Sequence, residues 1–391
     1  MLHMGDGSYK IDRIRAYALS CAVDGGPVSS LGLMPTRNGV LIEITDGDGV
    51  IGWGEAWCNY PPRSNVAKVN LLNDVIGPAV LNLSIKNWHE VRLELQRLFS
   101  RMMIHTGEPG AFKHCIAGID MALADLSARR QSVPLSSFLA GHAVNKLDVP
   151  VYCSTPNVER LEELVPQFEA SGHQCFKLKV GFGREIDSKN VSQFRKVAHE
   201  DTLMCCDANQ KWSLPEAVEA TDWLEEYDPL FIEEPILADA NPNEWVSLSK
   251  ASKVPLAAGE NITSQEKFEE HINERSLNIV QPDIAKWGGV SGSFNVGRYA
   301  LSKNTQCYLH YMGTALGQIA SLHTLAAIGG GGRLELDANP NPLRTDLGDV
   351  DFSLKAGALL CPQTHGIGFV PDPSQIEKFT VAKCDMRANK V

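Results

Sequence analysis

The sequence predicts an α/β protein in which strands and helices alternate to form a closed parallel barrel, preceded by a smaller α+β domain. The main observation is a row of ionisable residues at the ends of strand-like apolar runs, each 23 to 28 residues from the next. One strand, one crossover helix and two short loops need about that many residues. Functional side chains at the carboxyl ends of strands mark the catalytic face of a parallel barrel. The positions are Lys179, Asp207, Glu233, Glu260, Asp283, His310 and Glu335.

The first third of the chain is expected to form the α+β domain. Residues 10–55 read as an antiparallel meander, because β-rich runs flank the Asp/Gly turn at 46–49. Apolar residues at three- and four-residue spacing then predict helices over 88–102 and 111–128. Strands followed by helices in this way indicate a separate domain.

From about residue 149, short strand-like runs alternate with segments of helical periodicity. Eight strands with intervening helices suit a (β/α)8-type barrel, or one that lacks its last helix. After residue 347 the chain reads as turns and short extended pieces, which we expect to pack back on the N-terminal domain. The predicted strands are 149–153, 175–180, 203–207, 230–232, 256–258, 278–280, 306–309 and 333–336.

Composition and charge disfavour several classes of partner. The 391 residues are 43% hydrophobic and 21% charged, as in ordinary soluble proteins. The net charge of −11 argues against nucleic acid or an anionic membrane surface as the main partner. Ten cysteines without CxxC pairs favour reduced, buried thiols, and the sequence shows neither an export signal nor an apolar run of about 18 residues. We therefore expect a cytoplasmic protein with a small-molecule substrate.

Strand alternation predicts which side chains meet inside the barrel. In the run 175–180, Lys177 and Lys179 share the inward side, and the same parity turns Asp207 and Asn209 inward. For the remaining strands the expected inward pairs are Phe231 with Glu233, Ala258 with Glu260, Gln281 with Asp283, Tyr308 with His310, and Arg333 with Glu335.

Three carboxylates on neighbouring strands predict a metal site. Asp207, Glu233 and Glu260 would converge on one small volume, where they would repel one another unless a cation lay between them. Oxygen ligands with positions left for water and substrate suit Mg²⁺, with Mn²⁺ as a possible substitute. The alternative is that each acid caps a helix or pairs with a lysine, but three acids in register favour the metal.

Two lysines and an Asp–His pair are the candidates for acid–base chemistry. A lysine beside a second cation and a divalent metal suits a general base, which we expect Lys179 to be. Lys177 takes part in catalysis or, with equal weight, neutralises the metal-site acids. Asp283 lies on the strand adjacent to that of His310, where an aspartate can hold the tautomer of an imidazole.

Taken together, these motifs resemble the enolase superfamily, and more closely its mandelate racemase subgroup. The resemblance covers nearly the whole chain, with all of the motifs in order and at barrel spacing. Its barrel motifs are Lys177-Leu-Lys179, Asp207-Ala-Asn209, Glu233-Glu-Pro235, Gly259-Glu-Asn261, Asp283 with Lys286-Trp-Gly-Gly289, His310 and Glu335. Its N-terminal motifs are Gly52-Trp-Gly-Glu-Ala56 and Ala117-Gly-Ile-Asp-Met-Ala-Leu-Ala-Asp125.

The resemblance implies a modified (β/α)7β TIM-type barrel over residues 133–346 and an α+β capping domain over residues 1–132. The segment 347–391 would complete the capping domain, and lid loops at about 20–35 and 57–63 would close over the substrate. The family's habits also imply a homo-oligomer.

The resemblance also implies roles for the site residues. The three carboxylates would bind Mg²⁺, which would hold the carboxylate of a hydroxylated acid, while Lys179 and His310, oriented by Asp283, would serve opposite faces of its α-carbon. Glu335 would hydrogen-bond the second carboxylate oxygen and, to donate that bond, would have to be protonated. Asn209, Lys286, Trp57, Tyr60 and Arg63 are the expected substrate-binding or supporting residues.

The leading hypothesis is a sugar-acid dehydratase acting on an aldonate or aldarate and giving a 2-keto-3-deoxy acid. Lys179 would remove the α-proton, and His310 would expel the β-hydroxyl as water. The alternative is a racemase or epimerase of a 2-hydroxy acid that uses the same two residues as opposed bases. Cycloisomerases and amino-acid epimerases fit less well, because those relatives usually have a lysine where Asp283 stands. A non-catalytic sugar-acid-binding barrel is a remote alternative from another class.

Overall fold

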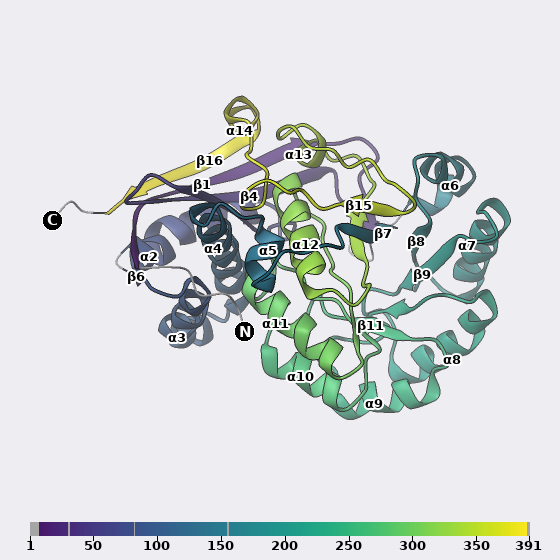
Figure 1. Ribbon diagram of the computed structural model, residues 1–391. Coiled ribbons are helices and arrows are strands. Elements are labelled where there is room, and N and C mark those ends of the chain that lie inside the picture. The colour runs from purple at the N-terminus through teal and green to yellow at the C-terminus, as the bar shows by residue number, and fades with distance from the viewer. Residues whose placement is uncertain (1–7, 30–31, 82, 155, 389–391) are drawn as a thin grey trace.

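A mainly antiparallel sheet and a closed parallel barrel are the two main parts of the fold, and Figure 1 shows them side by side. The computed structural model describes residues 8–29, 32–81, 83–154 and 156–388. Within these ranges, no helix combines the length and the apolar character that a membrane crossing requires.

The sheet brings together the two ends of the chain. Its strand order is β16-β1-β4-β5, all antiparallel, and the short β6 pairs with the start of β1. The β4–β5 hairpin turns at Asp46, whose Oδ1 accepts hydrogen bonds from the backbone N–H groups of Asp48 and Val50. The strands are β1 Tyr9–Ala22, β4 Thr36–Asp46, β5 Ile51–Ala56, β6 Ser84–Ile85 and β16 Thr380–Arg387, and a separate two-stranded pair is formed by β2 Val28–Ser29 and β3 Gly32–Leu33.

Strand β16 and the preceding helix α14 (Pro373–Phe379) differ from the expectation of turns and short extended pieces after residue 347. In β16, Ala382, Cys384 and Met386 alternate with exposed residues and pack partly against the core. The local signal is weak because an edge strand of a half-solvated sheet buries only one face, and that face only in part. Pairing with β1, from the other end of the chain, decides the structure here.

Helix α4 (Pro109–Arg130) lies against both the sheet and the barrel. It is buried on nearly every side between Phe112 and Ala128, as is typical of a helix that is apolar all round. Gly52 and Gly54 of β5 let it approach the sheet, because a Cβ added at either position would collide with the α4 backbone. The other helices of this region are α1 Ser64–Leu71, α2 Gly77–Leu81, α3 Trp88–Thr106 and α5 Leu135–Ala140, with a π-helical turn at Leu72–Ile76.

The barrel closes on itself. Pairing runs β13-β12-β11-β10-β9-β8-β7-β14, and a parallel bridge between Leu309 and Leu334 joins the two ends. The predicted fold class, a (β/α)7β barrel with an α+β cap, is confirmed. The strands are β7 Asp148–Ser154, β8 Cys175–Lys179, β9 Leu203–Asp207, β10 Ile232–Glu233, β11 Leu256–Ala258, β12 Ile279–Val280, β13 Gln306–Cys307 and β14 Leu334–Asp337. The helices between them are α6 Leu161–Ala170, α7 Arg184–Val197, α8 Leu214–Leu224, α9 Pro242–Ala251, α10 Gln265–Asn273, α11 Gly289–Ser302 and α12 Ala315–Ile328.

After β14 the chain passes through α13 (Pro342–Thr345) and β15 (Ala358–Leu360) before it reaches α14 and β16. Strand β15 pairs antiparallel with β7 of the barrel, whereas β16 joins the N-terminal sheet. The C-terminal segment therefore contacts both parts of the fold.

An apolar floor fills the barrel below its polar strand ends. One expected inward residue was wrong, because Ala257 and not Ala258 belongs to the interior cluster, and Ala258 packs outside. Strand β11 ends at Ala258, and Gly259 then lies so close to the backbone of Gln281 that a side chain would not fit. This turn, rather than strand alternation, directs Glu260 towards the other site residues. The floor consists of Tyr152, Cys175, Cys205, Phe231, Ala257, Ile279 and Tyr308.

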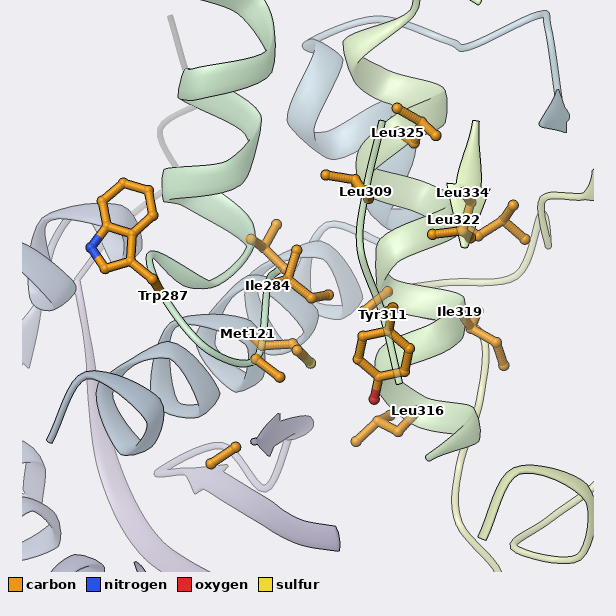
Figure 2. Packing of buried hydrophobic residues seen from close by; sticks show 14 of the residues in the cluster. Met121, Ile284, Trp287, Leu309, Tyr311, Leu316, Ile319, Leu322, Leu325 and Leu334 are labelled. Carbon is orange, nitrogen blue, oxygen red and sulfur yellow. The ribbon is translucent and has the colours of Figure 1, made fainter. Parts of the chain in front are cut away.

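A larger apolar cluster joins the barrel to α4. Figure 2 shows Met121 of α4 in this cluster together with Ile284, from the loop that follows β12, and Tyr311, from the loop that follows β13. Both loops are therefore packed against the N-terminal part of the chain. Because these two loops carry Asp283 and His310, the packing bears directly on the site.

Candidate active site

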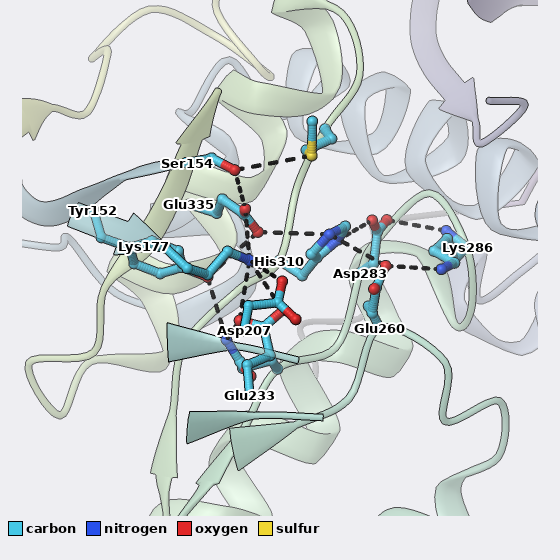
Figure 3. A network of polar contacts seen from close by, with 12 residues as sticks. Tyr152, Ser154, Lys177, Asp207, Glu233, Glu260, Asp283, Lys286, His310 and Glu335 are labelled. Atoms are coloured by element: carbon cyan, nitrogen blue, oxygen red, sulfur yellow. Dashed lines mark hydrogen bonds and ion pairs between the residues drawn. The ribbon is translucent and has the colours of Figure 1, made fainter. Parts of the chain in front are cut away.

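Side chains from the carboxyl ends of the barrel strands meet in one network of polar contacts, as Figure 3 shows. Parallel pairing brings them to one level, and Glu233 lies in register with Asp207 on the neighbouring strand. The structure brings together nearly all of the predicted metal-site and acid–base residues. Those that are buried are Lys177, Lys179, Asp207, Glu233, Asp283, His310 and Glu335, together with Lys286.

Lys177 lies among three carboxylates. Its Nζ is 3.0 Å from both carboxylate oxygens of Glu233, 2.8 Å from Glu335 Oε1 and 3.4 Å from Asp207 Oδ2. The side chain is only 1% exposed. Burial lowers the pKa of Lys177, but Glu233 and Glu335 more than offset this effect and leave the pKa well above its ordinary value. In this arrangement Lys177 is a fixed cation that neutralises the acids, one of the two roles expected from the sequence.

Lys179 pairs with a single carboxylate, that of Asp207, at 2.5 Å from Oδ2. Burial would raise the pKa of Asp207, but Lys179 and Lys177 hold it below its ordinary value. Asn209 follows in a left-handed conformation with φ of 44°, and its backbone N–H donates to Asp207 Oδ1. Asn209 Oδ1 is buried without a hydrogen-bond partner among the described residues, so it is available to a ligand.

Glu233 is the one predicted metal ligand of the three whose pKa lies above its ordinary value. Burial raises its pKa to about 7, and Asp207 and Glu335 add to this rise although Lys177 opposes it. Besides Lys177, its carboxylate accepts a hydrogen bond of 2.8 Å from Gln281 Nε2. A divalent cation between Glu233 and Asp207 would relieve this repulsion.

Glu260 links the acids to the histidine. Its Oε2 is 2.9 Å from Lys286 Nζ and 3.2 Å from His310 Nε2. Burial would raise the pKa of Glu260, but Lys286 and His310 lower it strongly. Lys286 also donates to Asn261 Oδ1 at 2.8 Å.

His310 and Asp283 form the expected pair. Asp283 Oδ2 accepts a hydrogen bond from His310 Nδ1 at 2.7 Å, and Asp283 Oδ1 accepts from the backbone N–H of Ala285, also at 2.7 Å. The imidazole is therefore oriented with Nε2 towards Glu260 and Glu335. Burial opposes the charged imidazole, but these carboxylates raise the pKa of His310 to about 10.

Glu335 lies between two cations, Lys177 and His310, and its protonation in the presence of substrate stays a prediction. Burial raises its pKa, but Lys177 and His310 outweigh burial and leave the pKa below its ordinary value. Its carboxylate accepts a hydrogen bond of 2.5 Å from Ser154 Oγ. The sequence argument took account of the substrate oxygen and omitted the two neighbouring cations.

The three predicted metal ligands fit Mg²⁺ by their donor chemistry. All are carboxylates at or just beyond the ends of successive strands, and each is held by a cation. However, no group of three or more His, Cys, Asp or Glu side chains within the described ranges is arranged around a common metal position. Asp207 and Glu233 face Lys177 and Lys179, whereas Glu260 faces Lys286 and His310. Metal binding therefore requires at least some of these ion pairs to rearrange.

The predicted lid residues differ in their contacts with the rest of the site. Trp57 covers Lys286, whose Nζ is 4.9 Å from the indole centroid. The backbone N–H of Trp57 donates to Ala285 O at 3.1 Å. Tyr60 lies beside Trp57, with ring centroids 6.4 Å apart, and its hydroxyl is buried without a hydrogen-bond partner in the described part of the chain. Arg63 is exposed at the N-cap of α1. Residues 30–31 of the other predicted lid loop lie outside the described residues, and its role stays a prediction.

Sequence reasoning missed three residues of this network. Tyr152 and Ser154 of β7 both contact Glu335, and the alternation of that strand is the signal that could have found them. Glu234 is fully buried at φ of 40° and accepts two hydrogen bonds of 2.9 Å from Asn261. Burial, and then Glu260, raise the pKa of Glu234 well above its ordinary value. Only the acidic repeat of the Glu233-Glu-Pro235 motif points to it in the sequence.

Comparison with known proteins agrees with this architecture over both parts of the chain. Residues 159–375 match the family described as enolase C-terminal domain-like. Residues 22–140 match the mandelate racemase / muconate lactonizing enzyme N-terminal domain. A curated relative, the arabinonate dehydratase of Saccharolobus solfataricus, is 25% identical over 348 residues, which cover 87% of this chain and 90% of that protein.

Two solved structures show the same fold. The mandelate racemase/muconate lactonizing enzyme from Bordetella bronchiseptica RB50 is 35% identical with a TM-score of 0.88, over 95% of this chain and 99% of that one. A racemase from Streptomyces coelicolor A3(2) with bound magnesium has a TM-score of 0.84 at 23% identity, over 95% of this chain and all of that one. The chain is a member of the mandelate racemase / muconate lactonizing enzyme family, within the enolase superfamily.

Proposed function

We propose that this protein is a Mg²⁺-dependent sugar-acid dehydratase, which converts an aldonate or aldarate to a 2-keto-3-deoxy acid. The observation that supports it most is that two groups able to carry a proton, Lys179 on β8 and the Asp283–His310 pair beyond β12 and β13, lie in one network of carboxylates. Dehydration needs one group to remove a proton from carbon and another to protonate the departing hydroxyl. The similarity to an arabinonate dehydratase supports the same reaction class.

The proton transfers follow from the positions of these side chains. Lys179 Nζ would take the α-proton, and the electron pair of that C–H bond would move towards the substrate carboxylate. His310 would then give its Nε2 proton to the β-hydroxyl as the C–O bond breaks and water leaves. The resulting enol would tautomerise to the 2-keto-3-deoxy acid.

The remaining residues would hold and balance charge. Mg²⁺ bound by Asp207, Glu233 and Glu260 would bind the substrate carboxylate and offset the negative charge that develops on it. Asp283 would keep the His310 ring in place, and Lys177 would neutralise the carboxylates that face it. Asn209 Oδ1, which is unpaired among the described residues, would accept hydrogen bonds from substrate hydroxyl groups, and the Tyr60 hydroxyl would accept from them or donate to them.

The test is a screen of the purified protein with Mg²⁺ against a library of aldonic and aldaric acids, with detection of 2-keto-3-deoxy products. We expect turnover of at least one acid, and loss of turnover in Lys179→Ala and His310→Asn with circular dichroism unchanged. A screen without any product, under conditions in which a known dehydratase scores, would contradict the proposal.

A racemase or epimerase is the second candidate, because the same two proton carriers could act as opposed bases. The structural likeness to a racemase keeps this reaction open at the level of the fold. In deuterium oxide it would incorporate deuterium at the α-carbon without release of water. Deuterium exchange that is followed by a keto product would instead identify the dehydratase.

A further inference from the structure

The helices that follow the Asp283 and His310 loops both begin next to the N-terminal part of the chain. Helix α11 starts at Gly289, shortly after Asp283, and α12 starts at Ala315, shortly after His310. The first N–H groups of any helix lack partners within the helix and attract negative charge. What satisfies these groups therefore also fixes the two loops.

Asp120 of α4 satisfies the start of α11. Its Oδ1 accepts from the backbone N–H of Ser291 at 2.8 Å, and its Oδ2 accepts from the Ser291 hydroxyl at 2.5 Å. The N-cap of α11 is Gly288, which has no side chain to cap the helix. Arg92 of α3 donates to the same serine hydroxyl at 3.0 Å. The cap of this barrel helix is therefore supplied by another part of the chain.

Glu55, the last polar residue of β5, does the same for α12. Its carboxylate accepts from the backbone N–H of Thr314 at 2.9 Å, from the Thr314 hydroxyl at 2.5 Å and from the backbone N–H of Gly317 at 3.1 Å. Glu55 is only 2% exposed. Burial raises its pKa, and the hydrogen bonds from Thr314 oppose that rise.

The contact at Glu55 reaches the residue next to His310. A Cβ added at Gly313 would collide with both the Tyr311 hydroxyl and the Glu55 carboxylate, so the loop wraps closely around these two groups. Tyr311 is buried in the cluster that Figure 2 shows between α4 and α12. A shift of the Glu55 carboxylate would therefore move the backbone on which His310 is carried.

We infer that Glu55 and Asp120 are positioning residues for the reaction. Both carboxylates belong to the N-terminal part of the chain, and each caps a barrel helix. Asp120 caps the helix that follows Asp283, and Glu55 caps the helix that follows His310. The inference rests on the proposed function, in which His310 transfers a proton. Misplacement of a reacting group by about 1 Å can reduce a rate about 100-fold. The N-terminal part of the chain thus contributes to the geometry of proton transfer.

The test compares Glu55→Gln with a matched control, Asp125→Asn. Asp125 is also a fully buried carboxylate of the same region, and it accepts backbone hydrogen bonds from Trp53 at 2.9 Å and Ile367 at 2.6 Å. Those partners belong to β5 and the C-terminal segment, away from the His310 loop. With the acid turned over fastest in the library screen, we expect Glu55→Gln to lower kcat by about tenfold or more with KM within about twofold. Asp125→Asn should lower the melting temperature by a similar amount and leave kcat within about twofold.

A second pair of variants changes Thr314 and leaves Glu55 in place, so that the inference can be tested even if Glu55→Gln misfolds. Thr314→Val removes the hydroxyl that donates to Glu55 and accepts from the backbone N–H of Leu316, and Thr314→Ser keeps both bonds. We expect the valine variant to lower kcat and the serine variant to restore it. Equal kcat values for the two, or equal kcat losses in Glu55→Gln and Asp125→Asn, would overturn the inference and leave Glu55 with a general role in stability.

A readout independent of turnover separates this inference from the proposed function. In protein labelled with ¹⁵N-histidine, the His310 imidazole signals can be assigned by their loss in His310→Asn. Glu55→Gln should shift these signals, whereas Asp125→Asn should not. Shifted signals in a protein that turns over no acid would support the positioning role and count against the dehydratase. Unshifted signals in an active enzyme would do the reverse.

Discussion

The two halves of the site are held in different ways. On β8, β9 and β10 the charged side chains lie on or at the end of regular strands, and ion pairs within the barrel, such as Lys177 with Glu233, fix them. On the other half, Asp283 and His310 lie beyond the ends of β12 and β13, in loops that the N-terminal part of the chain holds. Backbone bonds such as Trp57 N–H to Ala285 O make that attachment.

The difference matters because the two halves have different proposed tasks. Carboxylates that bind Mg²⁺ can reach its octahedral geometry partly by side-chain rotation, with water in the remaining positions. A histidine that donates a proton must present one nitrogen at one place. The half that would donate the proton to the departing hydroxyl is the one that is anchored from outside the barrel.

The largest expected effect comes from removal of the proton carriers one at a time. Lys179→Ala should abolish both α-proton exchange with solvent deuterium and product formation. His310→Asn should retain part of the exchange, because Lys179 is intact, and lose dehydration. Each loss of turnover should be about 10²- to 10⁴-fold, the usual contribution of a general acid or base. Mass spectrometry of the recovered acid measures exchange, and a variant pair that behaves identically would contradict the division of labour.

A change in the strand-held half should lower the stability of the protein, and Mg²⁺ should restore part of that stability. Lys177→Met leaves Glu233 and Glu335 without their central buried cation, and breaking a buried ion pair costs about 3–5 kcal/mol. Mg²⁺ should replace the lost charge, so it should raise the melting temperature of this variant more than that of the wild-type protein. Equal Mg²⁺-induced shifts, measured by calorimetry with and without a chelator, would show that the metal does not bind among these acids.

This contrast also explains which features sequence reasoning could reach. The strand-held residues follow from spacing and alternation, so Lys177, Asp207 and Glu233 were placed correctly by pattern alone. Glu260 was reached through an incorrect argument, since the chain turns at Gly259 and alternation ends at Ala258. Glu260 still reaches the site, because only Gly259 separates it from the end of strand β11.

The features that could not be predicted depend on partners distant in the sequence. Burial raises the pKa of Glu335, but Lys177 and His310, which meet it only in the closed barrel, bring it below its ordinary value. The attachments of the loops depend on the ends of α11 and α12 reaching Asp120 and Glu55, a tertiary contact with no local signal. The motifs that contain these two acids were recognised by resemblance, without a physical reason for the acids.

Helix α12 has a second attachment that should make stability depend on pH. His323 accepts a hydrogen bond at Nδ1 from the backbone N–H of Ser136 and donates from Nε2 to Ile367 O, each at 3.1 Å. Burial lowers its pKa to about 4, against about 6.5 in an unfolded chain. The unfolded chain therefore binds a proton first, so this contribution is complete above pH 6.5 and is lost as pH falls towards 4.

The size of that effect is about 3 kcal/mol, from the difference of the two pKa values. Urea unfolding at several pH values should show His323→Gln losing less stability than the wild-type protein between pH 6.5 and 4. His173 and His271, which also have pKa values of about 4, remain in both proteins and cancel in the comparison. Parallel stability curves would mean that His323 does not titrate in this window.

The smallest expected effect tests the side-chain link between the predicted lid loop at 57–63 and the His310 loop. Asn59 Nδ2 donates to Met312 O at 3.0 Å, two residues beyond His310. Loss of one partly exposed hydrogen bond should cost about 0.5–1.5 kcal/mol, so Asn59→Ala should lower the melting temperature only slightly. Because Glu55 still holds Thr314, kcat should change less than in Glu55→Gln. KM should rise, because residues 57–63 are predicted to close over the substrate. A larger fall in kcat for Asn59→Ala than for Glu55→Gln would mean that the lid loop, and not the helix caps, sets the position of His310.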